Sequence, residues 1–85
     1  MKTKPETTIE KVIAKLERVA EINFCSFRYE LGYNKSEKEP YAFICRSDWQ
    51  MQVMFSTGKT IEEAFEEAWN SMTEQLLNNG YRPVE

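Results

Sequence analysis

The sequence predicts a small α+β domain with the element order α-β-β-β-α, in which a three-stranded antiparallel sheet has two helices packed on one face. Two segments repeat apolar residues at the 3.6-residue period of a helix, and the segment between them alternates apolar and polar residues as strands do. The chain has 85 residues, 41% of them apolar, which is enough for one small core. We therefore expect a single domain over residues 1–85, with a flexible tail at 1–6 and a folded part at 8–79.

Both predicted helices begin at a capping signal, in which a threonine stands three residues before a glutamate. The two pairs are Thr7 with Glu10 and Thr60 with Glu63. The first helix is expected over about residues 8–21. The second is expected from Ile61 to the stop before Gly80, a residue that suits the left-handed end of a helix.

Three strands are expected between the helices. The first contains the alternating residues Cys25, Phe27, Tyr29 and Leu31, and the others are expected at Tyr41–Arg46 and Trp49–Phe55, with Trp49, Met51, Val53 and Phe55 facing the core. If odd-numbered residues of the first two strands share the buried face, Cys25 stands opposite Cys45. Two cysteines are too few for a disulfide framework, so we expect buried thiols.

The helices cover one sheet face, which leaves the other to solvent or to a partner. The side chains expected on this open face are Arg28, Glu30, Ala42, Ile44, Arg46, Gln50, Gln52 and Met54. Guanidinium, amide and thioether groups around the apolar Ile44 suit the recognition of a partner. An ordinary hydrated face and self-association into a homodimer are the alternatives.

Charge is distributed unevenly along the chain, whose net charge is −3. Residues 61–79 carry five glutamates and no cation, and all five fall opposite the apolar stripe of the second helix. They are Glu62, Glu63, Glu66, Glu67 and Glu74. On an open helix face nothing raises a carboxylate pKa or completes a metal's coordination sphere, so this face is either hydrated surface or a docking surface for a basic partner.

The composition excludes most catalytic sites. The chain has no histidine and a single aspartate, Asp48, which removes Ser-His-Asp and Cys-His sites and most zinc sites. Residues 56–60, Ser-Thr-Gly-Lys-Thr, resemble the tail of a phosphate-binding P-loop, but Val53 stands where its first glycine belongs. We expect a helix-capping turn there, with a weak anion site as the alternative. No enzyme activity, cofactor or metal is expected. No apolar run reaches the roughly 20 residues of a membrane helix, so a cytoplasmic protein without a membrane partner is expected.

The α-β-β-β-α order, with a glycine-containing turn before the last helix, resembles the double-stranded RNA-binding domain over about residues 8–79. That resemblance implies a lysine cluster at the start of the last helix, where this chain has Lys59 followed by glutamates. Residues 57–68, Thr-Gly-Lys-Thr-Ile-Glu-Glu-Ala-Phe-Glu-Glu-Ala, are similar to the end of HicB-type antitoxin modules. As a small acidic domain, the chain also resembles accessory proteins of phages and mobile elements, which include inhibitors of host defence.

The main functional hypothesis is a non-enzymatic binding protein that occupies the surface of a partner protein. The acidic helix, the open sheet face or both make the contact, and the acidic helix imitates nucleic acid toward a basic nucleic-acid-binding partner. The alternative is a module that itself binds nucleic acid with the open sheet face and the cations of the first helix, which are Lys11, Lys15 and Arg18.

Overall fold

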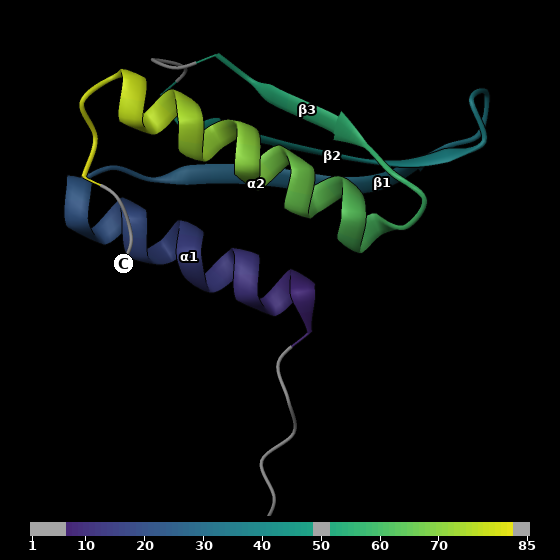
Figure 1. Cartoon of the computed structure of the whole chain (residues 1–85), viewed down its shortest axis with the longest axis horizontal. Coiled ribbons are helices and arrows are strands. Elements are labelled where there is room, and N and C mark those ends of the chain that lie inside the picture. The colour runs from purple at the N-terminus through teal and green to yellow at the C-terminus, as the bar shows by residue number, and fades with distance from the viewer. Residues whose placement is uncertain (1–6, 49–51, 83–85) are drawn as a thin grey trace, which may run out of the picture.

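The computed structural model describes residues 7–48 and 52–82, and its elements follow the predicted order (Figure 1). They are helix α1 (Thr8–Asn23), strands β1 (Phe27–Asn34), β2 (Glu39–Arg46) and β3 (Met54–Thr57), and helix α2 (Ile61–Asn78). The strands form an antiparallel sheet in the order β1-β2-β3. The α+β class and the α-β-β-β-α order are therefore confirmed. The predicted tail at 1–6 lies outside the described residues.

Both helices begin at the predicted threonine. At α1 the capping box is complete, since the Glu10 amide donates to the Thr7 hydroxyl and the Thr7 amide donates to the Glu10 carboxylate, each at 3.1 Å. At α2 the Glu63 amide donates to the Thr60 hydroxyl at 3.1 Å. The Glu63 carboxylate accepts from the Lys59 amide instead of the Thr60 amide, which is a variation on the predicted box.

Helix α2 packs across β2 and β3, while α1 lies beside α2 and reaches the edge of the sheet at β1 (Figure 1). The core lies between α2 and the sheet and is closed along one side by α1. Its buried members are Val12, Leu16, Val19, Ala42, Ile44, Met54, Ala64, Phe65, Ala68, Trp69, Met72 and Leu76. Both helices lie on one face of the sheet, and no described helix or strand covers the opposite face, although Cys45 on that face is fully buried.

The register between β1 and β2 differs from the predicted one. Arg28 is paired with Cys45, and Cys25 precedes β1, so the predicted pairing of the two cysteines is wrong. Both cysteines are free thiols, and Cys45 is buried as expected, whereas Cys25 is only partly buried. Since residues paired across antiparallel strands share a face, odd-numbered residues of β1 face the helices together with even-numbered residues of β2 and β3.

This register overturns part of the predicted open face. Ala42, Ile44 and Met54 are buried under α2, whereas Tyr41, Phe43 and Phe55 lie on the uncovered side. The physical reason is volume: α2 already fills the layer with large side chains, so β2 and β3 contribute alanine, isoleucine and methionine there and place their aromatic rings on the other face. The large side chains of α2 are Phe65, Trp69 and Met72.

The third strand is also displaced from its predicted position. It begins at Met54 and not at Trp49, and the expected inward residues Val53 and Phe55 are exposed. The remaining residues predicted here, Trp49, Gln50 and Met51, lie outside the described residues. Gln52 precedes the strand and is exposed.

Candidate functional site

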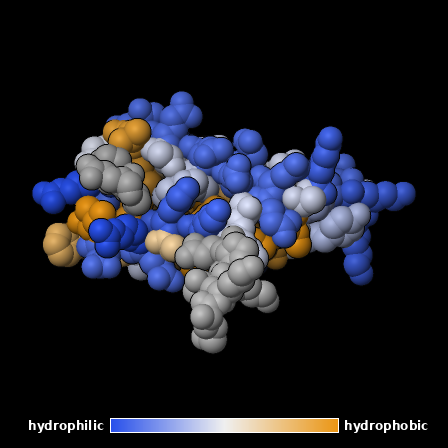
Figure 2. Space-filling model, turned by 60° about the horizontal axis from the view of Figure 1, so that its bottom comes forward, coloured by the Kyte–Doolittle hydropathy of each residue, from blue (hydrophilic) through white to orange (hydrophobic). Residues whose placement is uncertain are grey.

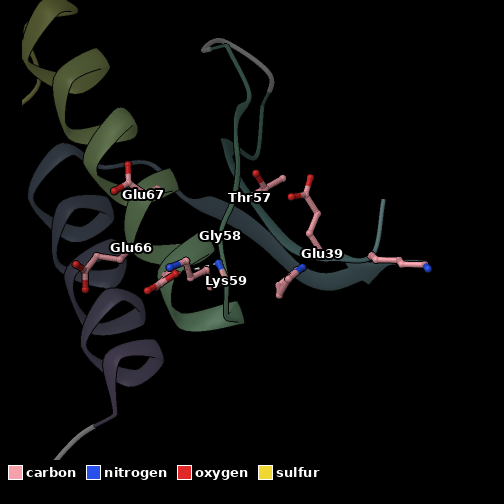
Figure 3. Close-up of a pocket in the computed structure, with 9 residues that line it drawn as sticks. Glu39, Thr57, Gly58, Lys59, Glu66 and Glu67 are labelled. Carbon is pink, nitrogen blue, oxygen red and sulfur yellow. Dashed lines mark hydrogen bonds between the residues drawn. The ribbon is translucent and has the colours of Figure 1, made fainter. Parts of the chain in front are cut away.

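The five glutamates predicted on the outer face of α2 are all exposed, as expected. Three of them, Glu63, Glu66 and Glu67, line an open groove of about 780 Å³ at the end of the sheet where α2 begins (Figure 3). Glu62 and Glu74 do not line it. The predicted acidic face therefore has two parts: three glutamates line the groove, and two lie on the exposed helix surface outside it.

The opposite wall of the groove comes from the start of β2. Glu39 lies there, on the other side of the Thr57–Lys59 segment from Glu66 and Glu67 (Figure 3). The residues that line the groove include four carboxylates and the two ammonium groups of Lys38 and Lys59, a formal charge of −2. Sequence analysis missed Glu39 because it started the second strand at Tyr41, two residues too late.

The turn into α2 is fixed by close packing. A Cβ at Gly58 would stand 2.9 Å from both the Ala64 amide nitrogen and the Glu63 Cβ, so this position requires glycine. The Glu63 carboxylate accepts from the Lys59 amide at 2.9 Å. A carboxylate of the protein itself therefore occupies the place where the weak anion site was considered, and the capping turn is confirmed.

The uncovered sheet face carries an aromatic pair that the sequence analysis had assigned to the core. The rings of Tyr41 and Phe55 stack with centroids 5.8 Å apart, and the Tyr41 hydroxyl donates to the Glu30 carboxylate at 2.8 Å. This bond raises the pKa of Tyr41 above its ordinary value, with smaller contributions from burial and from the Glu30 charge. Phe55 remains 59% exposed. Thr57 is paired with Tyr41, so the aromatic pair adjoins the groove.

Arg46 was predicted on the open face but lies on the helix side. Its Nε is 2.9 Å from an oxygen of Asp48, although the N–H does not point along that line. Its Nη1 donates to the Tyr81 hydroxyl, and the guanidinium lies over the Tyr81 ring, 5.6 Å from the centroid. Through these contacts with Tyr81, Arg46 links the end of β2 to the segment after α2. Of the predicted open face, Arg28, Glu30 and Gln52 remain exposed.

The cations of α1 do not form a separate basic pole. Lys11 and Lys15 line a hollow of about 290 Å³ between the helices, together with Glu66 and Trp69 of α2. The basic stripe therefore adjoins the acidic face and lowers its local charge. Arg18 is exposed on the same helix.

Cys25 and Cys45 carry the thiol groups of the chain. Burial raises the pKa of both thiols, and the nearby Arg46 at Cys25 and Arg28 at Cys45 only partly oppose this effect. A raised pKa leaves little thiolate at neutral pH. Within residues 7–48 and 52–82, no group of three or more metal-ligating side chains comes together.

Apolar surface is exposed in several places. Figure 2 shows separate apolar areas among hydrophilic residues, some of them at the end of the molecule where both helices finish. Phe24, which caps α1, is 93% exposed, and Leu77 near the end of α2 is 53% exposed. Neither described helix is long and apolar enough to cross a membrane.

Comparison of the chain with protein-family models, with curated proteins and with solved structures finds no match.

Proposed function

We propose that the protein is a non-enzymatic docking protein that binds a basic surface of a partner protein with the groove between β2 and the start of α2. The groove is lined by Glu39 of β2 on one side of the Thr57–Lys59 segment and by Glu66 and Glu67 of α2 on the other, and this arrangement is the observation that carries the proposal. Carboxylates on two walls accept lysine or arginine side chains from more than one direction, which a single charged helix face does not do.

Charge alone gives such a groove little affinity. An exposed ion pair contributes about 0.2 to 1 kcal/mol, so a stable complex also needs apolar or stacking contact. The neighbouring Tyr41 and Phe55 rings supply planar surface, with Phe55 more than half exposed. A guanidinium stacks on such rings better than an ammonium does. The partner surface in this proposal is therefore rich in arginine.

Nucleic-acid-binding proteins are the partner class that best fits this groove, because they expose arginines on their binding surfaces. Its phosphate-binding arginines carry the charge that the groove complements. A protein seated there competes with nucleic acid, so this proposal makes the chain an inhibitor whose glutamates imitate phosphates.

Direct nucleic-acid binding is the second candidate, and the observation that favours it is the exposed aromatic stack on the open sheet face. Bases stack on such rings in single-strand binding proteins. The carboxylate of Glu30 beside Tyr41 works against this candidate, and Arg46, which it required, lies on the other face. It predicts oligonucleotide affinity that falls steeply as salt is added.

The test compares two double variants with the same change in charge. Glu66→Gln with Glu67→Gln neutralises the groove, and Glu21→Gln with Glu74→Gln neutralises two exposed helix positions outside it. Each variant and the wild type serve as bait in host lysate, with and without nuclease. The captured proteins are then quantified by mass spectrometry.

The proposal predicts a protein that survives nuclease treatment, is retained by the Glu21/Glu74 variant and is lost from the Glu66/Glu67 variant. Equal retention by both variants contradicts the role of the groove. Capture that disappears with nuclease, together with salt-sensitive binding of a labelled oligonucleotide, supports the second candidate instead.

A further inference from the structure

Strand β1 forms an open edge of the sheet. The sheet order is β1-β2-β3, so among the described strands only β2 pairs with β1. The Ser47 amide donates to the Ser26 carbonyl at 2.9 Å. In the β1–β2 ladder, Ser26 and every second residue after it therefore direct their N–H and C=O groups toward β2. The alternate residues direct their N–H and C=O groups away from β2. They are Phe27, Tyr29, Leu31 and Tyr33.

Strand β1 lacks two of the residue types that commonly protect an edge from pairing. Strand β1 has eight residues, Phe-Arg-Tyr-Glu-Leu-Gly-Tyr-Asn, with neither proline nor lysine. Lysine, proline and short length are common devices that stop an edge from accepting another strand. The opposite edge, β3, has only four residues. Of the two edge strands, β1 therefore offers the longer edge for pairing with an added strand.

A groove of about 260 Å³ lies between this edge and α1. Phe27 and Tyr29 contribute from β1, while Ile13, Leu16 and Ala20 contribute from α1. Tyr29 is 41% exposed, although its ring also contacts Phe65 at a centroid distance of 5.3 Å. The groove is on the helix side of the sheet, so it would receive every second side chain of a strand added at β1.

The geometry points to strand addition at β1 by an extended segment of a partner protein, with apolar side chains at alternate positions and a lysine or arginine opposite Glu17. Among the described residues that line the groove, Glu17 is the charged one. Backbone bonds along the edge supply affinity, and the groove supplies selectivity. This site is separate from the acidic groove beside Glu66 and does not depend on it.

A single strand fits this edge better than a second copy of the chain. Helix α1 runs along the β1 side of the molecule (Figure 1). Two copies related by a twofold axis at the β1 edge would bring both α1 helices to the same side of the joined sheet, where they compete for one space. An extended peptide carries no such helix.

The test begins with selection of a displayed library of random octapeptides on the wild-type protein. Enriched peptides are expected to alternate apolar and polar residues and to place one basic residue on the apolar side. In Tyr33→Pro, the lost N–H is expected to weaken binding about tenfold, whereas Tyr33→Ala, which keeps the N–H, stays within about threefold. The residue Tyr33 is 55% exposed, which makes it the mildest position for this change.

Two further readouts keep the test decisive if the proline variant folds poorly. Peptide binding is expected to slow hydrogen exchange at the amides of Tyr29, Leu31 and Tyr33, which face outward in the free protein. Glu17→Lys is expected to turn the selected basic residue into an acidic one. Absence of enriched peptides, protection elsewhere, or equal binding by Tyr33→Pro would overturn the inference. So would a dimer in sedimentation that Tyr33→Pro dissociates, because the occupant would then be a second copy.

Discussion

Tyr41 lies across Gly32 of the neighbouring strand, with three atoms of its side chain 2.6 to 2.7 Å from the place where a Cβ on residue 32 would stand. The two residues are direct partners in the ladder between β1 and β2. The missing side chain lets the tyrosine lie flat, and in this position it reaches Glu30 and stacks on Phe55. The order of the open sheet face therefore depends on this contact.

Gly32→Ala is expected to destabilise the protein by about 1 to 3 kcal/mol, because the new methyl group displaces the Tyr41 ring. Urea denaturation measures the change. In a Tyr41→Ala background the same substitution should be neutral or stabilising by up to about 1 kcal/mol, since a strand residue then replaces glycine without a clash. An equal cost in both backgrounds would show that the tyrosine is not the cause.

The observed register predicts opposite sensitivities for two apolar residues. Ile44→Ala should cost about 2 to 5 kcal/mol, because Ile44 is fully buried under α2. Phe55→Ala should cost about 1 kcal/mol or less, because that ring is exposed and contributes mainly its stacking on Tyr41. Thermal or urea unfolding measures the loss of stability in both variants. A larger loss for Phe55→Ala than for Ile44→Ala would support the register predicted from sequence instead.

Tyr41 is expected to ionise above its ordinary pKa of 10.0, since its hydroxyl proton is held by the Glu30 carboxylate. The folded protein therefore retains this proton more strongly than the unfolded chain does. This stabilising contribution is complete below pH 10 and is lost as the pH rises through the folded pKa. NMR titration of the tyrosine ring carbons should show the shift, and Glu30→Gln should reduce it. No change in that variant would rule out the bond as the cause.

Asn23 fastens the segment after α2 to the end of α1. Its side-chain amide donates to the carbonyls of Val19 and Arg82, at 2.9 and 3.1 Å, and its oxygen accepts from the Arg82 amide at 2.9 Å. Asn23→Ala is expected to cost about 1 to 2 kcal/mol and to speed hydrogen exchange at Arg82.

Asn79→Ala is the matched control for that variant. It removes an amide that, among the described residues, donates to the Gln75 carbonyl at 2.7 Å, within its own helix end. A smaller loss of stability is therefore expected, with exchange at Arg82 unchanged. Equal effects of the two variants would argue against a joining role for Asn23.

The elements that could be predicted from sequence are those specified by local signals. A threonine cap and a long apolar stripe specify α2, and its outward glutamates follow from the same periodicity. The strand faces could not be predicted, because both alternating sets of β2 are apolar. Tyr41, Phe43 and Cys45 form one set, and Ala42 with Ile44 forms the other. A shift of one residue exchanges these sets, and the choice is made by the volume of α2 packed above them.

Only part of the acidic groove could be predicted from the sequence. The exposure of Glu66 and Glu67 follows from the helix alone, but Glu39 joins them only because β2 begins at Glu39, paired with Asn34, and packs beside β3 and α2. No local signal in the loop indicates this pairing. Residues of β2 and α2 can be placed in one groove only when the pairing of the strands is known. The sequence therefore predicts the wall formed by α2 but not the wall formed by β2.

Site-specific photo-crosslinking tests whether a partner docks in the groove that Glu66 and Glu67 line. A photoreactive residue at Thr57, an exposed wall of the acidic groove, is compared with one at Arg18, exposed on α1. After illumination in nuclease-treated lysate, we expect a protein adduct at position 57 that Glu66→Gln with Glu67→Gln abolishes, and none at position 18. Adducts at position 18 alone, or adducts at 57 that persist in the glutamine variant, would contradict docking through the acidic groove.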